Sequence, residues 1–174
     1  GRIYETFSEY IGFNVKLSYV DAPVIKNQPG TFVMKTFNTM EEGTYRTTYH
    51  EGDKCDPIYI GVETAEDGTD RSFSWYYNTE DTASGGEAIE SKFYRSSNGW
   101  YGYYLNKNFD AGTYYIYCVV RDTDKNNSKN YAETISKTCK IVFEALNADD
   151  FEGSGTEADP YLLKTQADMQ KLQE

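Results

Sequence analysis

Two stretches, Phe73-Ser-Trp75-Tyr-Tyr77 and Thr113-Tyr-Tyr-Ile-Tyr-Cys-Val-Val120, consist almost entirely of aromatic and β-branched residues. Such residues suit the pleated, half-buried surface of a β-sheet better than a helix. Similar short runs recur along the chain and are separated by polar turn clusters such as Ser84-Gly-Gly86. The predicted strands are Thr31–Phe37, Gly43–Tyr49, Pro57–Glu63, Ser72–Tyr77, Glu90–Tyr94, Gly99–Leu105, Thr113–Val120 and Thr134–Phe143. Short strands at this spacing predict an all-β fold, specifically a β-sandwich.

Composition limits both the size and the partners of this fold. The chain has 174 residues, and its 39% hydrophobic content is enough for one core and too high for a disordered chain. Its 28 acidic and 17 basic residues leave a net charge of −11, which disfavours binding to a nucleic-acid backbone. No apolar run approaches the roughly 18 residues of a membrane span, so we expect no direct membrane insertion. The isolated chain is expected to be monomeric.

The ends of the chain differ in character from its middle. Residues 1–22 include an alternating run, Phe13–Tyr19, which predicts either the last strand of an upstream unit or a captured edge strand. Pro23 then marks the start of the sandwich, predicted to occupy residues 23–146. Residues 147–174 form a polar linker followed by a short predicted helix, for which Thr165 is the N-cap. We therefore expect an excerpt of a longer protein.

The middle of the chain resembles a bacterial immunoglobulin-like (Ig-like) domain of surface proteins. The matching segments occur in order, with an inserted hairpin between Thr31 and Tyr49. They are Pro23-Val-Ile25 for the opening strand, Ile58-Tyr-Ile60-Gly-Val62 for strand B, Phe73-Ser-Trp75 for strand C, and Asp110-Ala-Gly112-Thr-Tyr114-Tyr-Ile116 for the start of strand F. This resemblance implies a non-catalytic extracellular module that serves as a spacer, a display domain or an adhesion domain.

The same resemblance implies structural roles for three residues. Trp75 is expected between the two sheets, and Tyr114 is expected to form a tyrosine corner in which its hydroxyl bonds to upstream backbone. Ile116 takes the place of the strand F cysteine, and Ile60 or Val62 takes the strand B place. The inter-sheet disulfide of antibody domains is therefore expected to be absent.

The C-terminal stretch carries a second resemblance. Gly153-Ser-Gly-Thr156-Glu-Ala-Asp-Pro160-Tyr-Leu-Leu163 is similar to the opening of GLUG-type repeats in large bacterial surface proteins. It implies that such a repeat, often part of a parallel β-helix, begins here.

The chain has three cysteines, too few for a disulfide scaffold or a zinc site of standard spacing. If a hairpin is centred near Ser128, Cys118 lies opposite Cys139. These two thiols could then form a disulfide in an extracytoplasmic protein, or they could remain reduced as small apolar residues. Cys55 is expected to be unpaired.

One segment matches the spacing of a calcium-binding loop. Its oxygen-bearing residues are Asp122, Asp124, Asn126, Ser128, Asn130 and Glu133. Against calcium, the sixth position is Asn127 rather than glycine, and the flanking segments are predicted strands rather than helices. The alternative is a solvated hairpin tip, because Asp and Asn favour turns. No other cofactor is expected.

Clustered aromatic residues suggest an alternative function. The rings in question belong to Tyr76, Tyr77, Trp100, Tyr101, Tyr103 and Tyr104. Together they could form a stacking platform for glycans, with Tyr76, Trp100, Tyr101 and Tyr103 as the candidate ligand-binding residues. Alternatively, some are core residues and the others are ordinary exposed tyrosines.

Catalysis is not expected from this sequence. His50 is the only histidine, it lies beside the turn Glu51-Gly-Asp53, and no nucleophile partner is evident. We therefore predict a non-catalytic module at the bacterial cell surface or in the medium, with host or cell-surface glycans or proteins as its partners. The alternative is a glycan-binding module, for example one accessory to a secreted hydrolase.

Overall fold

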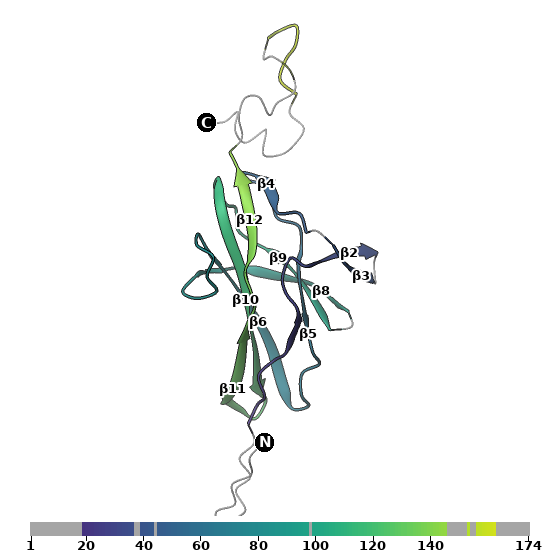
Figure 1. The fold of residues 1–174 in the computed structure, drawn as a ribbon, viewed down its shortest axis with the longest axis vertical. Coiled ribbons are helices and arrows are strands. Elements are labelled where there is room, and N and C mark those ends of the chain that lie inside the picture. The colour runs from purple at the N-terminus through teal and green to yellow at the C-terminus, as the bar shows by residue number, and fades with distance from the viewer. Residues whose placement is uncertain are drawn as a thin grey trace, which may run out of the picture.

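The computed structural model of the chain (Figure 1) describes residues 19–36, 39–43, 45–97, 99–145, 153 and 156–162. This part is all-β and contains no helix, which confirms the all-β part of the predicted fold. Accordingly, it offers no helix that is apolar and long enough to span a membrane. The predicted strand at residues 13–18 and the predicted helix starting at Thr165 lie outside the described residues.

One sheet has four antiparallel strands. In spatial order they are β1 (Ile25–Asn27), β5 (Ile58–Val62), β9 (Trp100–Leu105) and β8 (Ser91–Ser97). Ile58 faces Tyr103 across the β5–β9 pair, so Ile58, Ile60 and Val62 point to the same side as Tyr103 and Leu105. That side is the core side, since all five side chains are buried.

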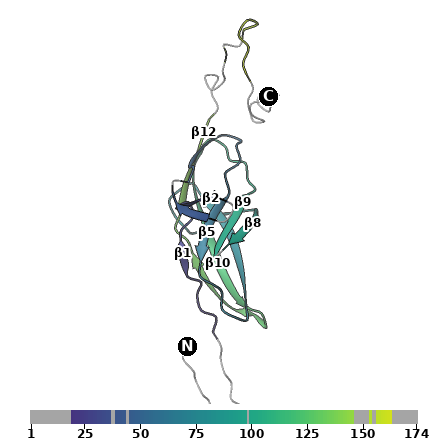
Figure 2. The ribbon, with the colours of Figure 1, turned by 90° about the vertical axis from the view of Figure 1, so that its right-hand side faces the viewer.

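The second sheet has six strands, and the long strand β10 lies at its centre. The spatial order is β4 (Thr48–His50), β12 (Cys139–Glu144), β10 (Gly112–Asp124), β6 (Thr69–Asn78) and β7 (Glu87–Ile89), while β11 (Asn127–Ile135) also pairs with β10. All pairs are antiparallel except β4 with β12, which is parallel. Figures 1 and 2 show the strands running along the long axis of the molecule.

A separate two-stranded hairpin, β2 (Phe32–Thr36) and β3 (Thr39–Glu42), follows β1. It projects to the right in Figure 1 and faces the viewer in Figure 2. The ring of Phe32 lies 4.6 Å from that of Trp100, so the hairpin packs against β9. The inserted segment between Thr31 and Tyr49 therefore forms its own small sheet.

Side chains from both large sheets build one core. Trp75, on β6, is only 1% exposed and is the largest fully buried side chain. Ile116 is fully buried on the neighbouring strand β10. Beside the core, the Tyr114 hydroxyl donates a hydrogen bond of 3.2 Å to the backbone carbonyl of Asp110. This bond ties the start of β10 to the loop that precedes it.

The strand predicted at Thr134–Phe143 is instead two strands, β11 and β12, separated at residues 136–138. Ser136 is buried at this break, where its hydroxyl accepts a hydrogen bond from the backbone amide of Cys118. Its own amide donates to the Cys118 carbonyl. Strand β10 thus stays paired along both edges. Along one edge its partner changes from β11 to β12 at this break, with a change of register. The short strands β3 and β7 were not predicted.

We predict that Tyr114→Phe lowers the free energy of unfolding by about 0.5–1.5 kcal/mol, the usual net value of one hydrogen bond. The measurement is urea denaturation followed by tryptophan fluorescence. The matched control is Tyr131→Phe, because Tyr131 is exposed on β11 and the substitution keeps its ring. An equal effect of both substitutions would contradict a structural role for the Tyr114–Asp110 bond.

Candidate functional site

The structure does not bring the four predicted ligand-binding aromatics onto one surface. Tyr76 lies on the six-stranded sheet, with its ring stacked on Tyr117 at 5.4 Å. Trp100 is partly covered by the β2–β3 hairpin. Tyr101 and Tyr103 point to the other side of β9, where Tyr103 is a core residue and Tyr101 packs against the core. A platform built from these four residues is therefore not formed.

Of the wider aromatic set, Tyr77 and Tyr104 have different surroundings. The Tyr77 ring packs edge-on against Phe109, at 5.3 Å, and its hydroxyl donates a hydrogen bond to Glu87. Tyr104 is 41% exposed and lies beside a surface depression. Only Tyr104 thus remains as a candidate for contact with a ligand.

The depression has a volume of about 660 Å³, within the range of small-molecule sites. We call it the β8–β9 hollow. Its lining residues are Lys54, Glu90, Ser91, Lys92, Phe93, Tyr104 and Asn106. They come from the start of β8, the end of β9 with the residue that follows it, and the loop before β5.

A β-bulge places several aromatic rings near the hollow. Lys92 faces Tyr104 and Phe93 faces Tyr103, but the next residue in register is Arg95, so Tyr94 is the extra residue. The Tyr94 ring lies 4.8 Å from Tyr104 in an edge-on arrangement. Phe93 is 52% exposed, although its ring contacts Tyr103 at 5.6 Å. The bulge therefore places the accessible rings of Tyr94 and Tyr104 side by side on one face of the sheet, while the ring of Phe93 lies with Tyr103 on the other face.

The polar groups of the hollow carry both signs of charge. The Asn106 side-chain amide donates to the Glu90 carboxylate at 3.0 Å, and the Asn106 backbone amide donates to the Glu90 carbonyl at 2.7 Å. These two bonds fix Glu90 beside Asn106. Lys54 and Lys92 are exposed, and neither forms an ion pair with a described residue. The hollow thus holds two ammonium groups that are not ion-paired and one carboxylate, that of Glu90, which is hydrogen-bonded to Asn106.

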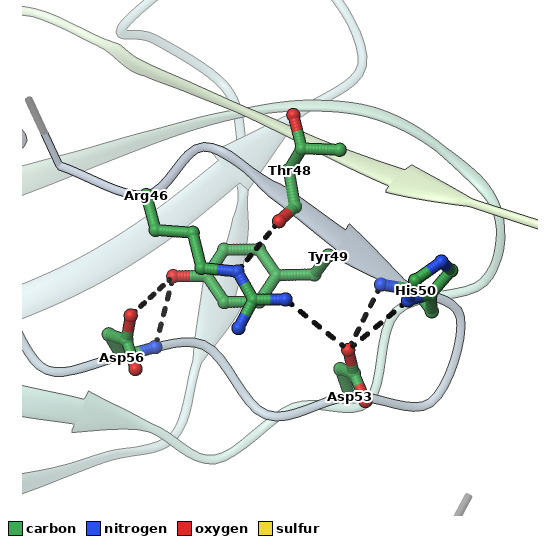
Figure 3. A network of polar contacts seen from close by, with 6 residues as sticks. All are labelled: Arg46, Thr48, Tyr49, His50, Asp53 and Asp56. Carbon is green, nitrogen blue, oxygen red and sulfur yellow. Dashed lines mark hydrogen bonds and ion pairs between the residues drawn. The ribbon is translucent and has the colours of Figure 1, made fainter. Parts of the chain in front are cut away.

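A network of polar contacts fixes the loop that supplies Lys54 (Figure 3). Asp53 accepts a hydrogen bond from the His50 backbone amide at 3.1 Å and lies 3.8 Å from the Arg46 guanidinium. Gly52 completes this turn at φ +81°, a conformation that favours glycine. His50, which was not expected to be catalytic, contacts Asp53 through its ring at 3.9 Å.

The other end of the same loop is held by two buried tyrosines. The Tyr49 hydroxyl donates to the Asp56 carboxylate at 3.4 Å and accepts from the Asp56 backbone amide at 3.1 Å. The Tyr45 hydroxyl donates to the Asp56 carbonyl at 2.7 Å. A smaller depression of about 210 Å³ lies beside these residues, below the usual size of a ligand site. We therefore assign the network to holding the loop.

The predicted calcium loop is a β-hairpin whose acidic side chains already have protein partners. Asp122 is buried, and Arg71 binds both of its carboxylate oxygens at 2.7 and 2.6 Å. Arg71 also donates to the Glu63 carbonyl. The hydrogen bonding that Arg71 donates to the Asp122 carboxylate is the largest cause of the raised pKa of Arg71. Burial of two charges is tolerated here because each one neutralises the other.

The remaining members of the calcium template lie elsewhere on the hairpin. Glu133 faces Arg121 across the β10–β11 pair and accepts its hydrogen bond at 2.7 Å, on the face opposite to Asp122. Asp124 caps the turn by accepting from the Asn126 amide at 2.8 Å and from the Asn130 side chain at 3.1 Å. Asn126 and Ser128 are exposed. The structure therefore does not gather the six residues around one point.

The predicted facing of Cys118 and Cys139 is wrong. Cys139 lies opposite Ile116, because the β10–β11 turn falls before Ser128. Along the other edge of β10, Cys118 lies opposite Trp75. All three cysteines are free and buried. Burial raises the pKa of the Cys55 thiol to about 12 and that of Cys139 to about 11. All three thiols are therefore protonated at neutral pH.

Comparison of the chain with family models, curated proteins and solved structures finds no match. The residues of the β8–β9 hollow themselves define what it can hold. Tyr104 and the adjoining Tyr94 offer apolar ring faces, the lysines offer positive charge, and Glu90 and Asn106 offer groups that bind hydroxyls. Phe93 and Tyr94 were not among the predicted site residues. The available sequence signal for the bulge was the adjacent aromatic pair Phe93-Tyr94, which departs from the alternation of apolar and polar residues in a regular strand.

We predict that Asp122→Ala destabilises the protein by about 3–5 kcal/mol, because it leaves the Arg71 charge buried without a partner. The matched control is the exposed ion pair between Arg121 and Glu133, where Glu133→Ala should lower the free energy of unfolding by only about 0–1 kcal/mol. The double substitution Arg71→Met with Asp122→Leu should recover most of the loss. Urea denaturation measures all three, in calcium and again in EDTA. Equal effects of the two single substitutions, or stabilisation by calcium that Asp122→Ala abolishes, would contradict the assignment.

Proposed function

We propose that the chain is a non-catalytic Ig-like module of a bacterial cell-surface or secreted protein, followed by the start of a GLUG-type repeat. In this proposal it acts as a spacer, a display domain or an adhesion domain outside the cell. The observation that carries the proposal is the order of the strands in the two large sheets.

The strand order supports an Ig-like sandwich strand by strand. The four-stranded order β1-β5-β9-β8 corresponds to strands A-B-E-D of such a fold. The other sheet, β4-β12-β10-β6-β7, corresponds to A′-G-F-C-C′, with β11 as the outer part of strand G. In this scheme Trp75 is the core tryptophan of strand C, and the Tyr114–Asp110 bond is the tyrosine corner at the start of strand F.

A spacer role is supported by where the chain enters and leaves the sheets. The segment leading to β1 lies at the bottom of Figure 1, and β12 ends at the top. Modules with entry and exit at opposite ends can be joined in series without doubling back. The parallel pairing of β4 with β12 anchors the exit strand to the sheet along its final residues, Val142–Glu144.

The glycan-binding alternative is favoured by one observation, the β8–β9 hollow with its exposed rings. It does not require the platform of Tyr76, Trp100, Tyr101 and Tyr103. An adhesion role and a glycan-binding role are compatible, because none of the residues that line the hollow belongs to β1 or β12, the strands by which the chain enters and leaves the sheets.

Antibodies raised against the purified chain test the proposed location. We expect them to label intact cells of the source bacterium or to detect the protein in its culture medium. Labelling that appears only after lysis, with a cytoplasmic enzyme as the release control, would contradict an extracellular module.

A further inference from the structure

We infer that the β8–β9 hollow binds a carboxylated sugar, such as a uronic acid residue of an acidic glycan. This inference goes beyond the spacer role and does not depend on it. It rests on the combination of accessible rings, two lysines and a fixed polar pair in one depression of about 660 Å³.

The rings account for the sugar. Tyr104 lines the hollow and is 41% exposed, and the adjoining Tyr94, on the same face of the sheet, is 39% exposed, so apolar ring surface is available to a ligand. A pyranose presents C–H groups on its faces and hydroxyls at its edge. Its C–H groups can cover the rings, while Asn106 and Glu90 bind the hydroxyls. The Tyr94–Tyr104 contact holds the Tyr104 ring in place before a ligand arrives.

The lysines account for the carboxylate. Lys54 and Lys92 reach the hollow from different segments, the loop before β5 and strand β8. Neither has an ion-pair partner among the described residues, in a protein whose net charge is −11. A ligand carboxylate would supply the missing counter-charge through charge-assisted hydrogen bonds.

The same charges limit the ligand to a low charge density. Glu90 lies inside the hollow and the chain carries a net charge of −11, so a polyanion such as a sulfated glycan or an acidic peptide would be repelled. At physiological salt, screening weakens the repulsion between charges that are more than about 8 Å apart. A single carboxylate bound at the lysines is therefore repelled much less than a polyanion. A singly charged sugar fits this pattern best.

The experiment compares two disaccharides by calorimetric or NMR titration of the full chain. The acidic probe is the disaccharide galacturonosyl-galactose, which carries a single carboxylate, and the neutral probe is the matching galactobiose. We expect the acidic probe to bind at least tenfold more tightly, since one charged hydrogen bond changes affinity by about that factor. Added salt should weaken its binding. Lys92→Gln and Lys54→Gln should each remove most of the preference, and Tyr104→Ala should weaken both probes.

The control substitutions lie on the six-stranded sheet, away from the hollow. Lys140→Gln changes an exposed lysine of β12, and Tyr131→Ala changes an exposed ring of β11. Neither should alter binding, and the unfolding midpoint of each variant checks that it is folded. The inference is overturned if the acidic probe does not bind, if both probes bind equally, or if Lys140→Gln acts like Lys92→Gln. It is also overturned if a polyglutamate peptide binds through the same residues as tightly as the sugar.

Discussion

The rest of the structure depends on the pairing of β10. Its thirteen residues pair with β6 along one edge and with β12 and β11 along the other. Strand geometry sends alternate side chains to opposite faces, so Ile116, Cys118, Val120 and Asp122 all point into the core. Trp75, directly opposite Cys118, then fills the space between the sheets. No disulfide is needed to hold the sheets, because their contact is made by packing.

The sequence predicts the all-β class and most of the long strands, because their aromatic and β-branched residues are dense and their turns are marked by glycine and acidic residues. It does not predict where strands break. Ser136 interrupts the strand expected at Thr134–Phe143 through a hydrogen bond to Cys118, a residue 18 positions away. The hairpin turn between β10 and β11 also lies earlier than expected, so Cys139 lies opposite Ile116 and not opposite Cys118. Such long-range contacts have no local sequence signal.

The candidate site, like the fold, could be predicted from the sequence only in part. Trp100, Tyr101 and Tyr103 are close in sequence and were predicted to share one surface. Successive residues of a strand face opposite sides, however, so Trp100 faces away from Tyr101 and Tyr103, and Tyr103 is buried in the core. Likewise, Asp122 matched a calcium template but points toward Arg71, a residue 51 positions earlier. The hollow depends instead on the bulge at Tyr94 and on a loop fixed by Tyr45, Tyr49 and Asp53, none of which could be placed without the fold.

Native-state hydrogen exchange, followed by NMR with and without dithiothreitol, tests the central claim that packing around β10 holds the two sheets together. We predict that the buried amides of β10 and β6 exchange only through global unfolding, with the same protection in both conditions. The exposed β2–β3 hairpin should open at lower free energy. Exchange of β10 through local opening, or a loss of protection in the reductant, would contradict the account.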